Sequence, residues 1–230
     1  EWHRHVPTYF TADDHELIND IYGAGETGYV NRRAVFRDIG TRAWFDYLAW
    51  ANPTEHDAPA HFGSAHFEKG SDVLEDPEAD FTGLPLADMA NLHVHWGTPT
   101  AGVPDSKLDA QPGDPNSAVY EIVKVLGPNK LKVKPEAKAT GKASYSIGRR
   151  CYGKFTVSNC DFFLLDTRTH RNLHNVDHPD NPKATMIGKK QLKWLKDAIR
   201  KSKSDFIFVV SSVNFMVPHV GSGGGDDKPR

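Results

Sequence analysis

The chain has 230 residues and a net charge of −2, from 28 basic and 30 acidic side chains, and 38% of its residues are hydrophobic. This composition is typical of a globular protein with a sizeable core, and it excludes a disordered chain. The near-neutral charge offers no positive field for nucleic acid, and no apolar stretch approaches the ~20 residues that a membrane-spanning helix needs.

Near the start of the chain, the apolar run Tyr9–Ala12 leads into Asp13-Asp14-His15-Glu16. We predict that this run is the end of a strand, which places the acids at a C-terminal strand tip, where open α/β sheets bind their ligands. Carboxylate oxygens can hold a hard cation there, and the imidazole can meet a phosphoryl or leaving-group oxygen, as in metal-assisted phosphate-ester hydrolysis. A solvated loop or a helix N-terminus explains the same acids equally well.

The next predicted element is a helix from its cap, Asn31, to about Trp50. Its apolar positions recur at helical spacing: Val35, Ile39, Ala43, Tyr47 and Leu48. Asn19 can offer an amide oxygen to the metal ion of the acidic motif, although a cap or a turn is its more common role. Arg32 and Arg33 can clamp a phosphate bidentately or can form a solvated helix face.

Residues 54–117 have weak periodicity, which predicts long loops with short strands. His93 and His95 within them would share one face of a strand, where packing or hydrogen bonding is a more common role than metal ligation. Beyond them, the alternating segments 120–125 and 130–134 flank a turn and predict a β-hairpin.

Cys160–Asp166 is continuously apolar apart from its acids and predicts a central strand buried on both faces. A helix over residues 188–203 follows, with Leu192, Leu195, Ala198 and Ile199 on one stripe, and then a second buried strand over residues 206–210. This order of strand, helix and strand predicts a crossover unit and a partly parallel sheet.

Other polar residues here have mainly structural interpretations. Asp166 and Arg168, at the strand tip, are predicted to pair with each other or to brace neighbouring loops. His170, His174 and His178 recur every four residues, but the prolines and asparagines among them favour a loop over a helix that would align them on a metal. The two cysteines, 151 and 160, can form a disulfide or stay free.

Four separate stretches follow one family pattern in their order and spacing. They are Ala12-Asp13-Asp14-His15-Glu16 with Asn19; Asn31-Arg32-Arg33-Ala34; Phe162 to Arg171, which contains Leu165-Asp166-Thr167-Arg168; and Met186-Ile187-Gly188 with Gln191 and Trp194-Leu195, followed by Phe206 to Phe215. Together they resemble the alkaline phosphatase D (PhoD-like) branch of the metallophosphoesterase superfamily across most of the chain. Ala12 departs from the family's tryptophan at that position.

The resemblance implies an α/β fold, a metallophosphoesterase-like α/β/β/α sandwich in which two mixed sheets pack face to face, seen here as an incomplete central portion. Residues 1–53 and 146–230 would be parts of one phosphoesterase catalytic domain. Residues 54–145, which match nothing in the family pattern, would be a loop-rich insertion with a β-hairpin.

The resemblance also implies metal-dependent hydrolysis of phosphomonoesters or phosphodiesters. Asp14 and Asn19 would bind metal, and His15 would hydrogen-bond the phosphoryl group or protonate the leaving oxygen. Arg32 or Arg33 would steady the phosphate-ester substrate. PhoD-like enzymes typically use iron with calcium, and relatives use zinc or manganese; the sequence does not choose among these ions.

The family takes further ligands from acids upstream of Glu1 and from a Gly-Asp-x-His element downstream of Arg230. We therefore expect this chain to be a fragment that is inactive without its flanking segments. The resemblance also implies that the protein is secreted, either extracellular or periplasmic. The alternative is a non-catalytic extracellular binding or scaffold protein that retains the phosphoesterase fold.

Overall fold

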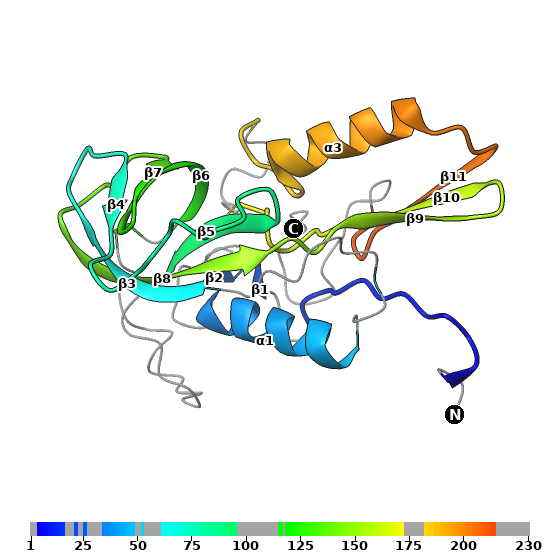
Figure 1. Ribbon diagram of the computed structural model, residues 1–230, viewed down its shortest axis with the longest axis horizontal. Coiled ribbons are helices and arrows are strands. Elements are labelled where there is room, and N and C mark those ends of the chain that lie inside the picture. Colours follow the sequence, from blue (N-terminus) through cyan, green and yellow to red (C-terminus); the bar gives the residue numbers. More distant parts are fainter. Residues whose placement is uncertain are drawn as a thin grey trace, which may run out of the picture.

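The computed structural model contains a closed β-barrel that is joined to a small three-stranded sheet (Figure 1). It describes residues 4–16, 21–22, 25–26, 34–48, 52, 61–95, 115–116, 118–172 and 182–214. Helix α1, Ala34–Tyr47, contacts the barrel at β8, and helix α3, Gly188–Lys201, lies over the three-stranded sheet. A two-stranded ribbon of β1, Ile21–Tyr22, and β2, Gly25–Glu26, lies beside α1.

The barrel is built from six strands that follow one another around a closed ring in the order β3-β4-β7-β6-β5-β8. Their bounds are β3 His61–Phe67, β4 Val73–Glu75, β5 Met89–His95, β6 Val119–Gly127, β7 Lys130–Lys134 and β8 Gly141–Arg149. Every neighbouring pair is antiparallel. Closure pairs both edges of each strand, so the barrel presents no open edge.

The barrel interior is the main hydrophobic core of the described residues. In β7, Leu131 and Val133 are buried while the lysines between and beside them face outward, as the period of a strand requires. The hairpin predicted from this alternation is confirmed, because β6 and β7 pair antiparallel across a tight turn. Aromatic side chains fill the core as well, with Phe67, Phe81 and Tyr145 among the largest fully buried residues.

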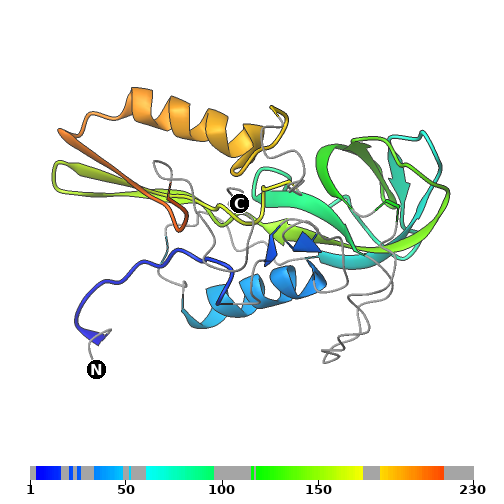
Figure 2. The ribbon, with the colours of Figure 1, turned by 180° about the vertical axis from the view of Figure 1, so that it is seen from behind.

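The three-stranded sheet has the order β11-β10-β9, with bounds β9 Gly153–Val157, β10 Cys160–Leu164 and β11 Phe206–Val210. Strand β10 is central, and it pairs antiparallel with β9 and parallel with β11. The predicted central strand, helix and crossover unit are therefore confirmed. Strand β8 leads directly into β9, so one stretch of chain belongs to both the barrel and the sheet (Figures 1 and 2).

Helix α3 begins in a tight turn against the segment that follows β10. The backbone N–H of Gly188, the first residue of the helix, donates to Thr185 Oγ1 at 2.9 Å, so this N–H has a partner outside the helix. Gly188 has a φ of +68°, and a Cβ there would lie 3.1 Å from His170 Cβ. A residue without a side chain is needed for both reasons.

Several burial predictions are wrong. In β11, Phe206, Ile207, Phe208 and Val209 are 41–57% exposed rather than buried, because β11 is an edge strand of the described sheet. On α1, the predicted apolar stripe is exposed at its described side chains, Ile39, Ala43, Tyr47 and Leu48. Among the described side chains of that helix, the buried one is Trp44 instead, packed with Phe10, Ala12 and Cys151.

The predicted metallophosphoesterase-like α/β/β/α sandwich is also wrong for the described residues, which are mostly β with two helices and a closed antiparallel barrel. A sandwich needs two open sheets that pack face to face, whereas a barrel closes one sheet on itself and fills its own interior. Only the β10-α3-β11 unit has the expected α/β form. The division into residues 1–53, 54–145 and 146–230 stays a prediction.

Cys151 and Cys160 do not form a disulfide with each other, which resolves the alternative that the sequence left open. Within the described residues, no helix has the length and apolar character needed to cross a membrane.

Candidate functional site

The N-terminal segment crosses the face of the three-stranded sheet opposite α3 (Figures 1 and 2). Aromatic rings anchor it there: Tyr9 stacks on Phe155 with ring centroids 3.9 Å apart. Phe155 stacks on Phe162 at 4.9 Å, and Phe162 stacks on Phe208 at 4.8 Å. This row of stacked rings crosses all three strands. The N-terminal segment packs on it and runs toward the C-terminal ends of β10 and β11.

The predicted strand at Tyr9–Ala12 is absent, because no strand pairs with this part of the segment among the described residues. The Asn52 side chain makes the main-chain hydrogen bonds that a neighbouring strand would otherwise make. The N–H of Phe10 donates to Asn52 Oδ1 at 2.9 Å, and Asn52 Nδ2 donates to the Phe10 carbonyl at 2.7 Å. The acidic motif is therefore placed by one amide and by aromatic packing rather than by a β-ladder.

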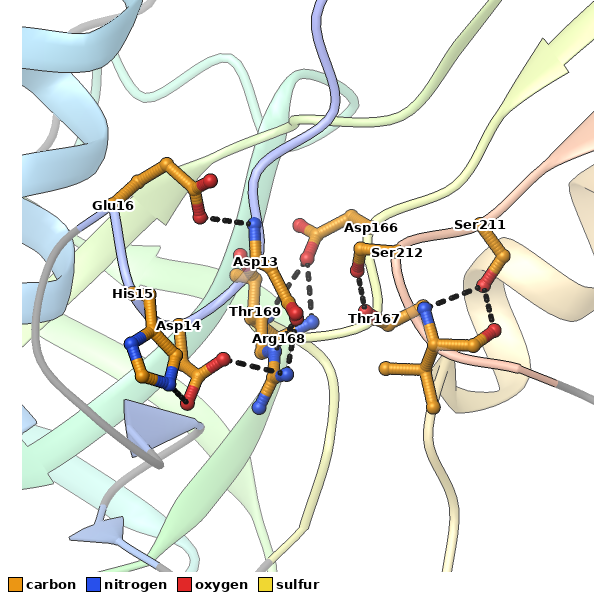
Figure 3. Close-up of polar contacts among 11 residues, drawn as sticks. Asp13, Asp14, His15, Glu16, Asp166, Thr167, Arg168, Thr169, Ser211 and Ser212 are labelled. Carbon is orange, nitrogen blue, oxygen red and sulfur yellow. Dashed lines mark hydrogen bonds and ion pairs between the residues drawn. The ribbon is translucent and has the colours of Figure 1, made fainter. Parts of the chain in front are cut away.

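Asp13 and Asp14 meet Arg168 just beyond the end of β10 (Figure 3). Arg168 Nε donates to Asp13 Oδ1 at 2.7 Å, and its Nη2 donates to the same oxygen. The same Nη2 donates to Asp14 Oδ1 at 3.0 Å. One guanidinium group thus joins two neighbouring carboxylates to a strand end more than 150 residues away in sequence.

Arg168 is presented by a turn that Asp166 organises. Asp166 Oδ1 accepts the backbone N–H groups of Arg168 at 2.9 Å and of Thr169 at 2.8 Å. Gln191 of α3 holds the main chain of Asp166, with Oε1 accepting its N–H at 2.9 Å and Nε2 donating to its carbonyl at 2.8 Å. Asp166, Thr169 and Gln191 are all buried, so this support is shielded from solvent.

His15 lies at the outer side of the acidic motif (Figure 3). Its side chain is 76% exposed, and its Nε2 is 3.7 Å from Asp14 Oδ2. Glu16 Oε2 accepts the N–H of Asp13 at 2.8 Å, which closes the loop around the two aspartates. The imidazole is therefore open to solvent beside a carboxylate that is nearly buried, an arrangement suited to proton transfer with a bound molecule.

A second polar layer surrounds the Asp166 turn. His93 Nε2 hydrogen-bonds the Thr169 carbonyl at 2.9 Å, so the structural role expected for this histidine is confirmed. The hydroxyl groups of Thr167 and Ser212 lie 2.7 Å apart and join the ends of β10 and β11. His170 Nε2 is 4.0 Å from Asp166 Oδ2, a buried oxygen that no hydrogen bond reaches within the described residues.

Electrostatics in this layer follow from burial. The ring of Tyr152 lies edge-on to His170 with centroids 5.5 Å apart. Burial raises the pKa of the Tyr152 hydroxyl, and the Arg150 guanidinium opposes this shift. The phenol therefore stays neutral and contributes packing and orientation to this layer.

Of the five predicted site residues, the structure describes two, Asp14 and His15, and they lie side by side. Asn19, Arg32 and Arg33 lie outside the described residues. The predicted bracing role of Arg168 is confirmed: its guanidinium binds Asp13 and Asp14, while the Asp166 side chain binds its backbone N–H. Gln191 was noted only as part of the family pattern, and its supporting role was missed, because helical periodicity does not reveal what a buried amide contacts.

The described residues do not by themselves fit a complete metal site. Among them, no three histidine, cysteine, aspartate or glutamate side chains gather in a way that could hold an ion. Asp13 and Asp14 share an organic cation, the Arg168 guanidinium. A zinc or iron centre needs about four ligands and calcium about six to eight, and one or two carboxylates do not supply that number.

In a comparison with known protein families, residues 135–227 match the family model of PhoD-like phosphatases. Searches of curated proteins and of solved structures found no match. The matched segment contains strands β8 to β11, helix α3 and the Asp166 turn, and it supports a phosphatase-type enzyme. The resemblance to the PhoD-like phosphatases is therefore confirmed, and residues 135–227 are the part of the chain that carries it.

Proposed function

We propose that this protein hydrolyses phosphate esters, either phosphomonoesters or phosphodiesters, at the junction of the acidic motif with the end of β10. One observation carries the proposal: Arg168, within the segment that matches PhoD-like phosphatases, binds Asp13 and Asp14, which lie outside it. Residues from two distant parts of the chain thus meet at the C-terminal edge of a parallel strand pair, where ligands of α/β units bind.

His15 is the proposed proton donor. Its imidazole is largely exposed, and it lies beside Asp14 Oδ2, a carboxylate oxygen that can orient it. A protonated imidazole can hydrogen-bond a phosphoryl oxygen or protonate the leaving alcohol in the transition state. Arg32 and Arg33 remain the proposed substrate-steadying residues.

Metal dependence is part of the proposal, with iron and calcium favoured by the resemblance and zinc or manganese as alternatives. Asp14 would contribute one oxygen ligand, and Asn19 is proposed as another. Because the described residues do not complete a site, the other ligands would have to come from other residues.

The test is turnover of p-nitrophenyl phosphate and bis(p-nitrophenyl) phosphate by the full-length protein and by two histidine variants. We expect His15→Ala to lower turnover and His66→Ala to leave it unchanged, because His66 is an exposed residue of β3 in the barrel. Absence of turnover on both esters in the wild type would favour the non-catalytic scaffold instead. Equal activity of all three proteins, on an alkyl phosphate ester as well, would show that the site lies elsewhere, because p-nitrophenyl leaving groups need little protonation.

A further inference from the structure

We propose that Arg168 is a positioning residue, which fixes Asp14 and His15 in the arrangement that ester hydrolysis needs; this inference rests on the proposed function. Arg168 follows β10, whereas Asp14 lies 154 positions earlier in the N-terminal segment. Their contact is a charged connection between the acidic motif and the strand end (Figure 3).

The first step is that Arg168 itself is held firmly. Its backbone N–H is bound by Asp166 Oδ1 at 2.9 Å, and the main chain of Asp166 is bound in both directions by Gln191. Because Gln191 is fully buried in α3, the turn is tied to the helix that covers the sheet. The guanidinium therefore starts from a rigid base.

The second step is that the guanidinium is committed to the acidic motif. Nε and Nη2 both donate to Asp13 Oδ1, and Nη2 also donates to Asp14 Oδ1 at 3.0 Å. The Arg168 side chain is only 12% exposed, against 76% for His15. A residue that clamps a substrate phosphate would present its donors to solvent, whereas Arg168 directs them at two carboxylates.

The third step links Arg168 to His15. Asp14 accepts from Arg168 through Oδ1 and faces His15 through Oδ2, so the carboxylate stands between the two side chains. Without Arg168, the loop that contains Asp13 and Asp14 keeps its internal hydrogen bond to Glu16. It loses the hydrogen bonds that join it to the segment after β10. A displacement of the proton donor by about 1 Å can cost about 10²-fold in rate.

A double-mutant cycle tests this coupling, with Arg168→Gln and His15→Ala made singly and together. We expect Arg168→Gln to lower kcat and kcat/KM about equally, by about 10²-fold, and to add little in the His15→Ala background. Arg168→Lys should recover only part of the loss, because an ammonium group cannot bridge two carboxylates as a planar fork does. Arg200→Gln, a change at an exposed arginine of α3, is the matched control and should have no effect.

A raised KM with unchanged kcat would mean that Arg168 binds substrate, and fully additive losses would mean that it acts only through general stability. Either result overturns the inference. If Arg168→Gln fails to fold, Asp13→Ala removes two of the three hydrogen bonds between Arg168 and the acidic motif, at a side chain that is 35% exposed. A smaller loss with the same kinetic pattern is then expected, because the bond to Asp14 remains.

Hydrogen–deuterium exchange over residues 11–16 gives a readout that does not depend on activity. Arg168→Gln should speed exchange in this segment, and Arg200→Gln should not. Unchanged exchange in Arg168→Gln would overturn the inference even if the wild type is active. An inactive wild type with faster exchange in the variant would refute the proposed function while leaving the tie between Arg168 and the acidic motif established.

Discussion

The side-chain amide of Gln191 forms two hydrogen bonds with the main chain of Asp166, one in each direction. Asp166 is the second residue beyond the end of β10, where the parallel pairing with β11 has stopped. The amide therefore supplies both bonds that a neighbouring strand would otherwise make. Through Asp166, this pair supports the turn that carries Arg168.

We predict that Gln191→Leu destabilises the protein by about 1–3 kcal/mol for each main-chain group of Asp166 that it leaves unpaired. Gln191→Glu keeps an acceptor for the Asp166 N–H but turns a carboxylate oxygen toward the Asp166 carbonyl, so its loss should shrink in acid as that carboxylate is protonated. Chemical denaturation at two pH values measures both effects. Lys196→Ala, on the exposed face of α3, is the control, and equal stability of all variants would contradict the prediction.

The second prediction concerns the chemical role of His15. As a general acid, it should matter most for poor leaving groups, so His15→Ala should cost about 10²–10⁴-fold on an alkyl phosphate ester. The loss should be smaller with a p-nitrophenyl ester, whose leaving group needs little protonation. Steady-state kinetics on the two substrates decide this, and equal losses would leave only electrostatic stabilisation.

The third prediction concerns metal content. If Asp14 is a ligand, the purified wild type should contain a bound ion and lose activity on dialysis against a chelator, and Asp14→Asn should bind less metal. Elemental analysis beside a thermal melt separates metal loss from unfolding, because Asp14 is buried next to Arg168. Asp80→Asn, in an exposed turn of the barrel, should keep the wild-type content. A metal-free active wild type would contradict this prediction.

The fourth prediction concerns a chain of hydrogen-bonded side chains inside the barrel, formed by Asp76, Tyr145 and His61. The Tyr145 hydroxyl donates to Asp76 Oδ2 at 2.7 Å, so its oxygen accepts from His61 Nε2 at 3.0 Å. Burial lowers the pKa of His61, and the nearby Asp76 carboxylate offsets this in part.

Because the pKa of His61 is lower in the folded protein than in the unfolded chain, the unfolded chain binds more protons than the folded protein once the pH falls to about 6.5, the pKa of His61 in the unfolded chain. The stability that neutral His61 contributes should therefore be complete above that pH and decline as the pH falls toward the folded-state pKa. His61→Gln should flatten this part of the curve of unfolding free energy against pH between 7.5 and 5. An unchanged slope would show that His61 is not the titrating group.

The fifth prediction concerns Gly63, which lies beside the same chain. A Cβ at this position would lie 2.6 Å from the Tyr145 hydroxyl and closer still to Asp76 Oδ2, so Gly63→Ala should destabilise the barrel by about 1–3 kcal/mol. Gly83→Ala, where a Cβ would meet nothing within 4 Å, should be close to neutral. Thermal melts of the two variants make the comparison, and a neutral Gly63→Ala would mean that the barrel relaxes around the added methyl group.

Local patterns in the sequence were sufficient wherever burial follows a simple period. The continuous apolar run of β10 and the apolar stripe of α3 identified the crossover unit, and the alternation of β6 and β7 identified their hairpin. The barrel was not foreseen because its closure depends on the pairing of β8 with β3 and β5, strands far from it in the sequence. The alternation in β8, where Ala143, Tyr145 and Ile147 face the core, can indicate a strand but does not say which strands are its neighbours.

The same difference between local sequence patterns and contacts distant in the chain applies to the candidate site. The sequence by itself determined that an acid–histidine motif and a strand-end Asp-Thr-Arg motif are present and resemble one family, because each motif is a run of neighbouring residues. Only the tertiary structure decided that Arg168 meets Asp13 and Asp14 and that Gln191 supports the turn that carries Arg168. These are contacts between residues far apart in the chain, and they depend on how the N-terminal segment packs on the sheet, which no local periodicity encodes.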